Sequence, residues 1–391
     1  MLVENNSYPK DPRVRREAKV LKSAGYKVAI ISPAEKNQPW REIVNEICVY
    51  RYPAPPRANG IASYLYEYSY SMVSIFALSL LVWVQQGFDI IHVANPPDTL
   101  VFIAAFYKLF GKRFVFDHHD LAPEMYYARF PQGGNRLIYR ALLFCEKLSC
   151  QLADRVIATN ESYKAVEMSR GGVAERHITI VRNGPVLKGV QRVNADGKLK
   201  NGAGTIVVYA GIIGVQDGVD FLLRALRHLV YDLRKTNMLC VVIGDGDALP
   251  GLKQLAQELN ITDYVYFTGW VEDPQTYASY IATADICVDP SPSNPYNNRC
   301  TTIKMMEYMA ASKPIVAFDL PEHRFTAQSS AIYARANDEA EFATSIAELI
   351  EDPPRRRQMG AAGRQRVEHA LAWHYCAPKL LEAYSGLLAK A

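Results

Sequence analysis

The chain has 391 residues, of which 49% are hydrophobic and 21% are charged, and its formal net charge is +4. This length predicts two or three globular domains, and the composition excludes a chain that is disordered over long stretches. The small net charge gives no indication of a nucleic-acid partner, since such proteins usually carry a strong basic excess.

The charge is distributed unevenly along the chain. Residues 1–190 hold 24 Lys and Arg against 17 Asp and Glu, whereas the remainder holds 20 against 23. A basic first half attracts anionic substrates or an anionic phospholipid surface, although a scattered solvated surface explains the same numbers. We therefore keep open a peripheral membrane contact through the basic N-terminal domain.

Seven cysteines lack any CxxC or metal-ligand spacing, which predicts reduced thiols in a cytoplasmic protein. No signal peptide is expected at the start. The first strand, Met1–Val3, is unusually short, and we expect the natural chain to start a few residues upstream.

The first half alternates predicted helices and strands. Residues 11–24 (DPRVRREAKVLKSA) predict a basic helix that Gly25 ends. Hydrophobic runs predict strands at 27–32, 44–52, 88–93, 114–116, 154–158 and 178–182. This repetition predicts a parallel sheet with helices on both faces.

Residues 61–84 are apolar enough to raise the question of a membrane span. Glu67 and several Tyr and Ser residues interrupt the run, so that its continuous apolar part is shorter than the roughly 20 residues a span needs. We predict a long helix packed in the first domain, with the alternative that one side of it lies on a membrane.

The strand at 114–116 runs directly into Asp117-His118-His119-Asp120. Ligands of open α/β sheets bind outside the carboxyl ends of the strands, so these four ionisable groups are a site candidate. Adjacent histidines point in different directions and no third ligand follows at metal spacing, so we predict no metal there.

Residues 189–204 are polar, contain glycine and lack periodicity, which predicts a linker between domains at 1–188 and 205–371. A second βα series follows, with strands predicted at 205–210, 239–243, 265–268, 286–288 and 315–318. Segments 337–351 and 353–369 predict surface helices, and we expect the amphipathic segment 372–391 to pack back on the first domain.

Glycines follow the first two strands of this second series. Gly211 and Gly214 come after one strand, and Gly244 comes after the next. Closely spaced glycines let the backbone approach the phosphates of a ligand. Asp245 and Asp247 form a DxD pattern, which holds a metal in some sugar transferases, but its place in a tight strand-to-helix turn predicts a turn role.

The stretch from Asp285 to Glu322 contains the largest group of candidate ligand-binding residues. Its polar loop ends at Thr301 and Thr302, which offer the N-cap of a helix with Lys304 and Glu307 on one face. A helix N-terminus favours phosphate, Lys304 would add a positive charge, and Glu307 could accept hydrogen bonds from a sugar diol. An exposed ion pair without function is the alternative.

Eight segments together resemble glycosyltransferase family 4 over essentially the whole chain. They are DPRVRREAKVLKSAGYKVAII, FDIIHVANPPD, FVFDHHD, ADRVIATNES, VRNGP, IGDGDAL, FTGWV and EYMAASKPIVAFD, in the family's order. The resemblance implies an α/β fold of the GT-B type, with two Rossmann-like βαβ domains facing each other across a deep cleft. It further implies a retaining transferase that moves a sugar from a nucleotide-sugar donor, by preference a UDP-sugar, to a glycan or lipid-linked acceptor in polysaccharide biosynthesis. Neither a cofactor nor a structural metal is implied.

The resemblance also assigns residues by position. Catalytic roles fall to His118, His119, Lys304 and Glu307. The donor would meet Gly211, Gly214, Gly244, Asp245, Val271, Asn298, Thr301, Thr302, Lys304 and Glu307. The acceptor side would comprise Asn5, Arg13, Asn95, Asp98, Asp120 and Asn160. In this scheme Glu307 binds the ribose hydroxyls, Gly214 lies in the loop around the diphosphate, and the backbone near Val271 meets the nucleobase.

Two departures from the family pattern change these expectations. Arg299 stands eight residues before Glu307, where the family has a glutamate, and the usual Arg and Lys are missing from GIIGVQDG at 211–218. Sugar contacts and phosphate charge must then come from elsewhere, with Lys304, Asn298, Thr301 and Thr302 as candidates.

Three functions remain open at this point. The first is the sugar transferase, in the cytoplasm or peripheral on the inner face of the membrane. The second is a nucleotide-sugar epimerase of the same fold, and the third is a non-catalytic nucleotide-sugar-binding subunit.

Overall fold

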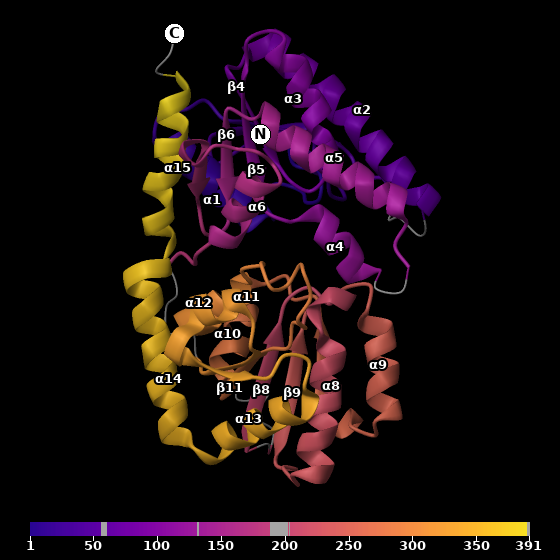
Figure 1. Cartoon of the computed structure of the whole chain (residues 1–391), viewed down its shortest axis with the longest axis vertical. Helices are drawn as coiled ribbons and strands as arrows, with labels where there is room; N and C mark the ends of the chain where they lie inside the picture. The colour runs from indigo at the N-terminus through magenta and orange to yellow at the C-terminus, as the bar shows by residue number, and fades with distance from the viewer. Residues whose placement is uncertain (56–60, 131–132, 188–201, 203, 389–391) are drawn as a thin grey trace. The chain divides into compact units, whose positions relative to one another are not determined.

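The computed structural model describes residues 1–55, 61–130, 133–187, 202 and 204–388, which form two compact units (Figure 1). The first unit comprises Met1–Tyr126, Gln132–Asn183 and Cys376–Ala391. The second unit comprises Tyr127–Pro131 and Gly184–Tyr375. The predicted linker, 189–204, lies almost entirely outside the described residues.

The first unit ends a few residues before the predicted boundary at 188. Gly184 and Pro185 already pack on the second unit, where the N–H of Trp373 donates to the carbonyl of Pro185 at 3.0 Å. A Cβ atom on Gly184 would lie 1.7 Å from the carbonyl oxygen of Leu371, so this close approach requires glycine.

A mainly parallel sheet forms the centre of the first unit. Its strands are β1 (Ala29–Ala34), β2 (Arg41–Val44), β3 (Ile47–Pro53), β4 (Ile90–Ala94), β5 (Arg113–His118), β6 (Arg155–Ala158) and β7 (Ile178–Ile180). One group has the order β1-β3-β2 and the other β4-β5-β6-β7. Leu2 joins the two groups, because it pairs in parallel with Ile31 on one side and with Val93 on the other.

Sequence analysis predicted one strand at 44–52, whereas the structure has the antiparallel hairpin β2–β3. Asn45 and Glu46 form its two-residue turn with φ angles of 50° and 63°. Such turns are usually marked by Asn-Gly or Asp-Gly, and the Asn-Glu pair here gave no comparable signal.

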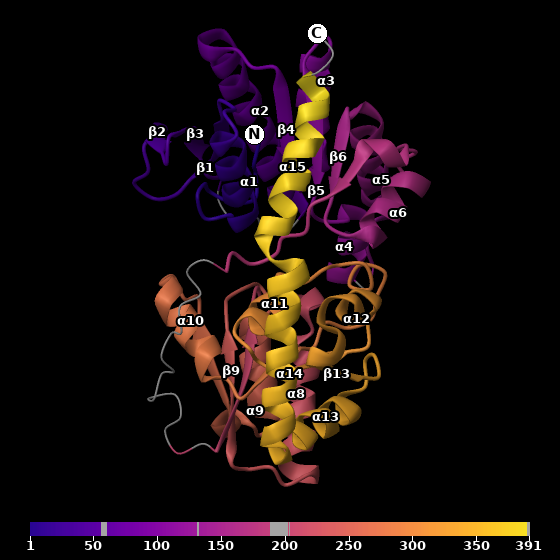
Figure 2. The ribbon, with the colours of Figure 1, turned by 90° about the vertical axis from the view of Figure 1, so that its left-hand side faces the viewer.

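Helices cover both faces of this sheet. They are α1 (Pro12–Ser23), α2 (Ile61–Gln86), α3 (Val101–Lys108), α4 (Ala122–Arg129), α5 (Arg136–Leu152), α6 (Glu161–Ser169) and α15 (Trp373–Leu388). Figures 1 and 2 show α2, α3 and α5 as one layer, with α1 and α15 on the other side of the strands.

The helix predicted at 61–84 is α2. Its inner face is buried at Ser71, Ile75, Ser79 and Val82, and the hydroxyls of Ser79 and Tyr107 lie 2.8 Å apart. Within the described residues, the stretch Tyr66–Gln86 is long and apolar enough to cross a membrane by length and composition.

The second unit is a doubly wound parallel sheet. Its strands are β8 (Thr205–Ala210), β9 (Met238–Ile243), β10 (Val265–Gly269), β11 (Ile286–Asp289), β12 (Ile315–Phe318) and β13 (Ala331–Ala334), in the order β10-β9-β8-β11-β12-β13. Only β13 was not predicted. The chain runs outward in both directions from the central pair, β8 and β11, so the strand order reverses between them.

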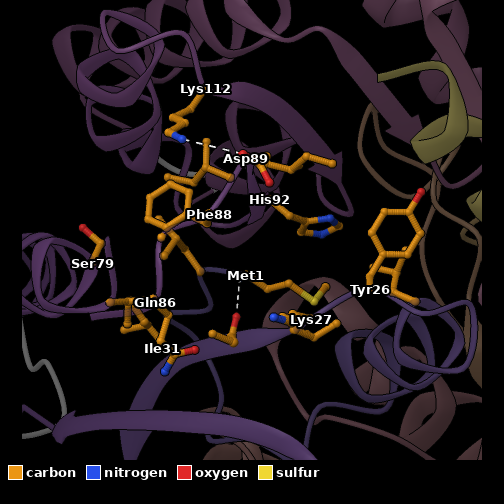
Figure 3. A pocket seen from close by; sticks show the side chains of 18 of the residues that line it. Met1, Tyr26, Lys27, Ile31, Ser79, Gln86, Phe88, Asp89, His92 and Lys112 are labelled. Carbon is orange, nitrogen blue, oxygen red and sulfur yellow. Dashed lines mark hydrogen bonds and ion pairs between the residues drawn. The ribbon is translucent and has the colours of Figure 1, made fainter. Parts of the chain in front are cut away.

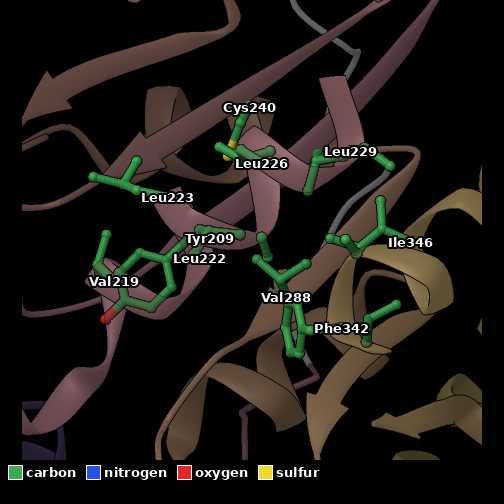
Figure 4. Packing of buried hydrophobic residues seen from close by; sticks show 14 of the residues in the cluster. Tyr209, Val219, Leu222, Leu223, Leu226, Leu229, Cys240, Val288, Phe342 and Ile346 are labelled. Carbon is green, nitrogen blue, oxygen red and sulfur yellow. The ribbon is translucent and has the colours of Figure 1, made fainter. Parts of the chain in front are cut away.

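Two hydrophobic cores lie on the two faces of this sheet. Alternate residues of β8 serve them, because Val207 and Tyr209 point to one face and Ile206 and Val208 to the other. Helices α8 (Val219–Arg227), α9 (Leu249–Glu258) and α13 (Glu339–Glu351) line the first core (Figure 4). Helices α10 (Pro274–Thr283), α11 (Ile303–Ala310) and α12 (Pro321–Ala327) line the second, and α14 (Pro353–Arg366) follows α13.

The prediction that 337–351 is a surface helix is wrong. Phe342, Ile346 and Leu349 of α13 are fully buried against the sheet. They recur at steps of four and three residues, the spacing of one helix face, and the acidic residues on the opposite face gave the impression of a solvated element.

Candidate functional site

The predicted donor residues gather at the carboxyl edge of the second sheet. They follow β8 (Gly211, Gly214), β9 (Gly244, Asp245), β10 (Val271) and β11 (Asn298, Thr301, Thr302) or lie on α11 (Lys304, Glu307). The edge beside β8 and β11 is the switch point of the sheet, where open α/β folds bind their ligands. The structure thus brings the predicted donor set to one edge.

Two glycine turns pack tightly under the start of α11. Gly211 has a φ of 156°, and a Cβ atom there would lie 3.2 Å from Cε of Lys304. Gly244 has a φ of 138°, and its Cβ atom would lie 1.8 Å from the carbonyl oxygen of Gly211. Only glycine fits at Gly244, and the backbone of both turns therefore comes close to the helix.

Thr302 occupies the N-cap position of α11, but its side chain does not cap the helix. The hydroxyl donates instead to Oδ2 of Asp289 at 2.7 Å. The hydroxyl of Thr301 is likewise directed elsewhere, to Oε2 of Glu322 at 3.1 Å. The amides of the first turn therefore receive no hydrogen bond from the Thr302 side chain and can serve an anionic ligand.

The ammonium group of Lys304 points beneath the glycine turn and is almost enclosed. It lies 3.2 Å from the hydroxyl of Tyr209, 3.5 Å from Oδ1 of Asp217 and 3.9 Å from Oδ1 of Asp289. It also sits 4.6 Å from the centre of the Tyr209 ring. Burial would lower the pKa of Lys304, but Asp289, Tyr209 and Asp217 together raise it above its ordinary value.

The two carboxylates around Lys304 differ in their electrostatics. Burial would raise the pKa of Asp289, but Lys304 and His323 hold it below its ordinary value. Burial raises the pKa of Asp217, and Lys304 offsets this only in part. Asp217 is therefore the easier of the two to protonate.

Sequence analysis missed Tyr209, Asp217 and Asp289 as members of this site. Asp289 gave a usable signal, since it is a charged residue at the end of the apolar strand Ile286–Asp289. Asp217 lies inside the glycine-containing turn, and its contact with a lysine 87 positions away is a tertiary contact that no local pattern reports.

Glu307 is half-buried one turn after Lys304, and its Oε2 atom accepts a hydrogen bond from the hydroxyl of Tyr277 at 2.7 Å. Lys304 and Glu307 thus contact different partners, which differs from the simple intrahelical pair kept as the alternative. Tyr277, on α10, is a further residue that the sequence did not indicate.

Asp245 and Asp247 have the roles of turn residues. Oδ1 of Asp245 accepts from the N–H of Gly246 at 2.8 Å, and Oδ2 of Asp247 pairs with Arg129 at 2.6 Å. In the polar loop after β11, Oδ1 of Asn298 accepts from the hydroxyl of Ser293 at 3.0 Å.

The polar loops of the first unit also gather at the carboxyl edge of their sheet. His118, at the end of β5, is fully buried, with Nδ1 3.1 Å from Glu167 and Nε2 3.8 Å from Glu146. Burial lowers the pKa of His118, but Glu167, Glu146 and Asp98 outweigh it and raise the pKa to about 9. His118 is therefore an internal cation whose ring nitrogens both face carboxylates.

His119 faces a different set of groups. Its Nε2 atom lies 2.5 Å from Oδ2 of Asp117, and its Nδ1 atom lies 3.4 Å from Nδ2 of Asn183. Oδ2 of Asp117 also lies 3.2 Å from Nε2 of His92. Burial would raise the pKa of Asp117, but His119 and His92 hold it below its ordinary value, so a buried carboxylate fixes the His119 ring.

Glu17, His92 and Asp117 place three ligand atoms within 4.8 Å of one another, the spacing of a metal-binding cluster. The hydrogen bonds of the cluster argue for another arrangement. Both ring nitrogens of His92 already have partners, the Tyr384 hydroxyl at 2.6 Å and Asp117. Burial and Asp117 raise the pKa of Glu17 well above its ordinary value, and neither of its carboxyl oxygens has a hydrogen-bond partner among the described residues. We therefore treat the cluster as a buried group of ionisable side chains centred on the hydrogen bonds of His92.

Three of the predicted acceptor-side residues hold loops in place. Asn95 accepts from the N–H groups of His119 and Asp120 at 2.6 and 3.1 Å and donates to Asp98 at 2.9 Å. Burial and Glu146 raise the pKa of Asp98 to about 7. Asn160 caps α6 by accepting from the N–H of Tyr163.

The other three predicted acceptor-side residues reach the surface. Asn5 is exposed, and Asp120 and Arg13 are partly exposed. Arg13 makes two hydrogen bonds with Asp11, at 3.2 and 2.9 Å, and lies 3.9 Å from Asp120. A ligand at this edge would meet a guanidinium whose charge is already balanced by carboxylates.

A cavity of about 530 Å³ lies elsewhere in the first unit (Figure 3). Its lining includes Met1, Ala29 near the start of β1, and Ile90 at the start of β4. It thus opens at the amino ends of these strands, away from the edge that carries the polar loops. We do not assign it to the candidate site.

Family models match both halves of the chain. The model described as Glycosyltransferase Family 4 matches residues 13–186, and the model described as Glycosyl transferases group 1 matches residues 204–352. Each unit of the structure thus carries one of the two matches.

Curated relatives show the same relationship. A D-inositol 3-phosphate glycosyltransferase from Thermomonospora curvata is 32% identical over 190 residues, covering 46% of this chain and 42% of the relative. A lipopolysaccharide core biosynthesis glycosyltransferase from Rhizobium meliloti is 29% identical over 186 residues, covering 47% and 48%. The chain spans about half the length of these relatives.

Solved structures share the fold over the full length of the chain. Sucrose-phosphate synthase from Thermosynechococcus elongatus has a TM-score of 0.80 at 20% identity, covering 100% of this chain and 96% of that one. HepE from Anabaena, in complex with UDP-glucose, has a TM-score of 0.73 at 15% identity, covering 98% and 99%.

The charge of His118 makes the stability of the first unit depend on pH. Its pKa in the folded chain, about 9, exceeds its ordinary value of 6.5, so its ion pairs stabilise fully below pH 6.5 and are lost as the pH rises through 9. We expect the free energy of unfolding to fall by roughly 2–3 kcal/mol over this interval. Urea denaturation at pH 6 and pH 9 measures it.

The variant His118→Gln should lose most of that pH dependence, and the exposed His374→Gln serves as its control. An unchanged dependence in His118→Gln would show that the imidazole is not charged in the folded chain.

Proposed function

We propose that this chain, which belongs to glycosyltransferase family 4 and has the two Rossmann-like units of the GT-B architecture, transfers a sugar from a UDP-sugar with retention of configuration. The acceptor is a glycan or a lipid-linked glycan of polysaccharide synthesis. No metal or cofactor takes part in this proposal.

The observation that carries the proposal is the start of α11 at the sheet's switch point. Its first-turn amides receive no cap from the Thr302 side chain, and the glycine turn at Gly211 packs closely beside Lys304 of the same helix turn. Free amides at a helix N-terminus bind phosphate groups through hydrogen bonds and the helix dipole. The complex of HepE with UDP-glucose supports UDP as the carrier.

The positive charge for the diphosphate comes mainly from the backbone in this proposal. Lys304 is shared between Asp217 and Asp289, so its charge is already balanced before the donor arrives. Protonation of Asp217, whose pKa is raised, would leave part of the positive charge of Lys304 uncompensated, and this charge would then attract the donor diphosphate. In this proposal the first-turn amides of α11 and the side chain of Lys304 replace the missing Arg and Lys of the family loop.

Glu307 is the proposed ligand of the ribose hydroxyls. The hydroxyl of Tyr277 donates to Oε2 of this carboxylate at 2.7 Å and so fixes its orientation at the carboxyl edge of the sheet. A carboxylate fixed in this way loses little side-chain entropy when the nucleoside binds.

The chemistry then follows from where charge develops. The bond between the anomeric carbon and the diphosphate breaks, and the leaving group gains negative charge that the α11 amides and Lys304 stabilise. The sugar becomes cation-like, as in glycoside hydrolysis. The acceptor hydroxyl attacks from the face that the diphosphate leaves and gives up its proton to it, so the configuration is retained.

In the first unit we assign the histidine role to His119. His118 is fully buried with both its ring nitrogens facing carboxylates, whereas His119 is 5% exposed and its Nδ1 atom faces the amide of Asn183. His119 follows the strand end and is held by Asp117, beside the loop that carries the partly exposed Asp120. The balanced charges there suit an acceptor with many hydroxyl groups rather than an anionic one.

Two rival functions give different products from the same assay. An epimerase would convert the free donor without any acceptor, and a binding subunit would be stabilised by donors without releasing nucleotide. A thermal-shift panel of nucleotide sugars, followed by measurement of nucleotide release, separates all three, because a bound ligand raises the melting temperature.

Replacement of Glu307 by glutamine should weaken donor binding by about 10- to 100-fold, since a hydrogen bond to a charged group contributes roughly 1.5–3 kcal/mol. Titration of UDP-glucose followed by calorimetry measures this. Glu258→Gln, on the exposed face of α9, is the matched control. Equal affinity in both variants would refute the assignment of Glu307.

Replacement of Asp217 by asparagine should tighten donor binding about fivefold. It removes one negative charge near the diphosphate, an effect of roughly 1 kcal/mol at an effective dielectric constant between those of protein and water, while an amide oxygen can still accept from Gly214. The same titration measures it. Weaker binding would instead mean that the Asp217 carboxylate contacts the donor directly.

A further inference from the structure

The outer face of one helical layer in the first unit is apolar. Helices α2 and α3 meet through Phe76 and Phe106, whose ring centres are 5.1 Å apart, and α3 packs on α5. Figures 1 and 2 show the three helices side by side on one face of the sheet. The large apolar side chains that are 49–84% exposed are Tyr66, Val73, Val84, Phe102, Leu137 and Phe144 on the helices, and Leu109 and Phe110 in the turn that follows α3. We call this set the apolar face.

Soluble proteins seldom gather this many exposed large apolar side chains on one helical layer, and such a layer usually binds a partner. Helix α2 contributes most to it, because only 22% of its most apolar stretch is buried. A helix that is apolar on all sides suits either a protein interior or a lipid environment. The inner side of α2 packs in the protein interior, whereas its outer side is exposed.

Helix α5 adds a regular pattern of charge to the apolar face. Leu137, Ala141 and Phe144 are exposed at steps of four and three residues, and so form one stripe. The exposed cations Arg136, Arg140 and Lys147 flank this stripe. Cationic side chains beside exposed leucine and phenylalanine are typical of helices that lie in a membrane interface.

Acidic side chains are nearly missing from this layer. Glu67 and Glu146 are the only acidic residues in the sequences of α2, α3 and α5, and Glu146 is buried against Arg170 at 2.6 Å. The layer therefore presents apolar groups and positive charge together, which complements an anionic lipid surface better than a neutral one.

We propose that the apolar face docks the first unit on an anionic phospholipid surface, with α2, α3 and α5 lying flat on the lipid. Helix α2 does not span the bilayer, because Ile75 and Val82 pack into the unit and Ser79 is bonded to Tyr107 of α3. The docking goes beyond sugar transfer and does not depend on it, although it would bring the enzyme to a lipid-linked acceptor.

Co-sedimentation of the full chain with vesicles tests this proposal. We expect binding to vesicles of phosphatidylcholine mixed with phosphatidylglycerol and much weaker binding to phosphatidylcholine alone. Each Lys or Arg near an anionic surface contributes roughly fivefold, so Arg140→Gln with Lys147→Gln should weaken binding about 30-fold. Sodium carbonate should release the bound protein, whereas a spanning helix would stay with the vesicles.

The pair Leu137→Ser and Phe144→Ser should also weaken binding to anionic vesicles, by about tenfold or more, because it removes apolar insertion without changing charge. Ile43→Ser, at an exposed position on β2 outside the apolar face, is the control and should bind as the parent does. The glutamine pair, the serine pair and the Ile43→Ser control should all melt at the same temperature, because all these side chains are exposed.

Three results would overturn the proposal. They are equal binding to neutral and anionic vesicles, unchanged binding after the Leu137 and Phe144 substitutions, and self-association that these substitutions abolish while vesicles do not bind. Nucleotide release with a soluble acceptor should stay unchanged in every variant. The docking and the sugar-transfer activity can thus fail independently.

Discussion

The buried contact of Lys304 with Asp217 and Asp289 organises the second unit around its ligand edge. It joins the loop after β8, the end of β11 and the first turn of α11, three segments that are distant in sequence. Removing one partner would leave buried charge uncompensated, which typically costs 3–5 kcal/mol, far more than an exposed ion pair contributes. The other oxygen of Asp289 accepts from the hydroxyl of Thr302, which therefore does not cap α11. The ion network and the missing side-chain cap of α11 thus share Asp289.

The first unit also buries a group of charged side chains at the carboxyl edge of its sheet. His118 is an internal cation between Glu167 and Glu146, and Asp117 fixes the adjacent His119. Because neighbouring residues at a strand end point to opposite sides, the two histidines contact different carboxylates. Both units thus bury many charges but leave little net charge at their ligand edges. In the proposed function, recognition at these edges would therefore depend on backbone amides and hydrogen-bonding groups, which suit a sugar and a diphosphate.

Local sequence patterns were sufficient for most of the fold. Strands β8 and β12 were predicted to the residue, because continuous apolar runs between turn residues mark buried parallel strands. The hairpin β2–β3 was missed because its turn uses Asn45 and Glu46, and α13 was misjudged because its acidic residues obscured a buried face. The residues predicted for the donor lie together at one edge of the sheet because glycine turns and helix starts follow strands directly. Asp217 and Tyr277 were missed because their importance comes only from contacts across the sheet, at separations of 87 and 30 residues.

The departures from the family pattern have a physical explanation in these contacts. A loop with Asp217 in place of cationic residues would repel a diphosphate if it stood alone. Lys304 approaches that loop from α11 and compensates the carboxylate, so in the proposed function the positive charge for a diphosphate comes from the first turn of α11 instead of from the loop. Gly211 is needed for this exchange, because its φ of 156° and the 3.2 Å approach of the lysine Cε atom leave little room for a side chain. Gly211, Asp217 and Lys304 therefore depend on one another. A substitution at any one of them changes the packing or the charge balance of the other two.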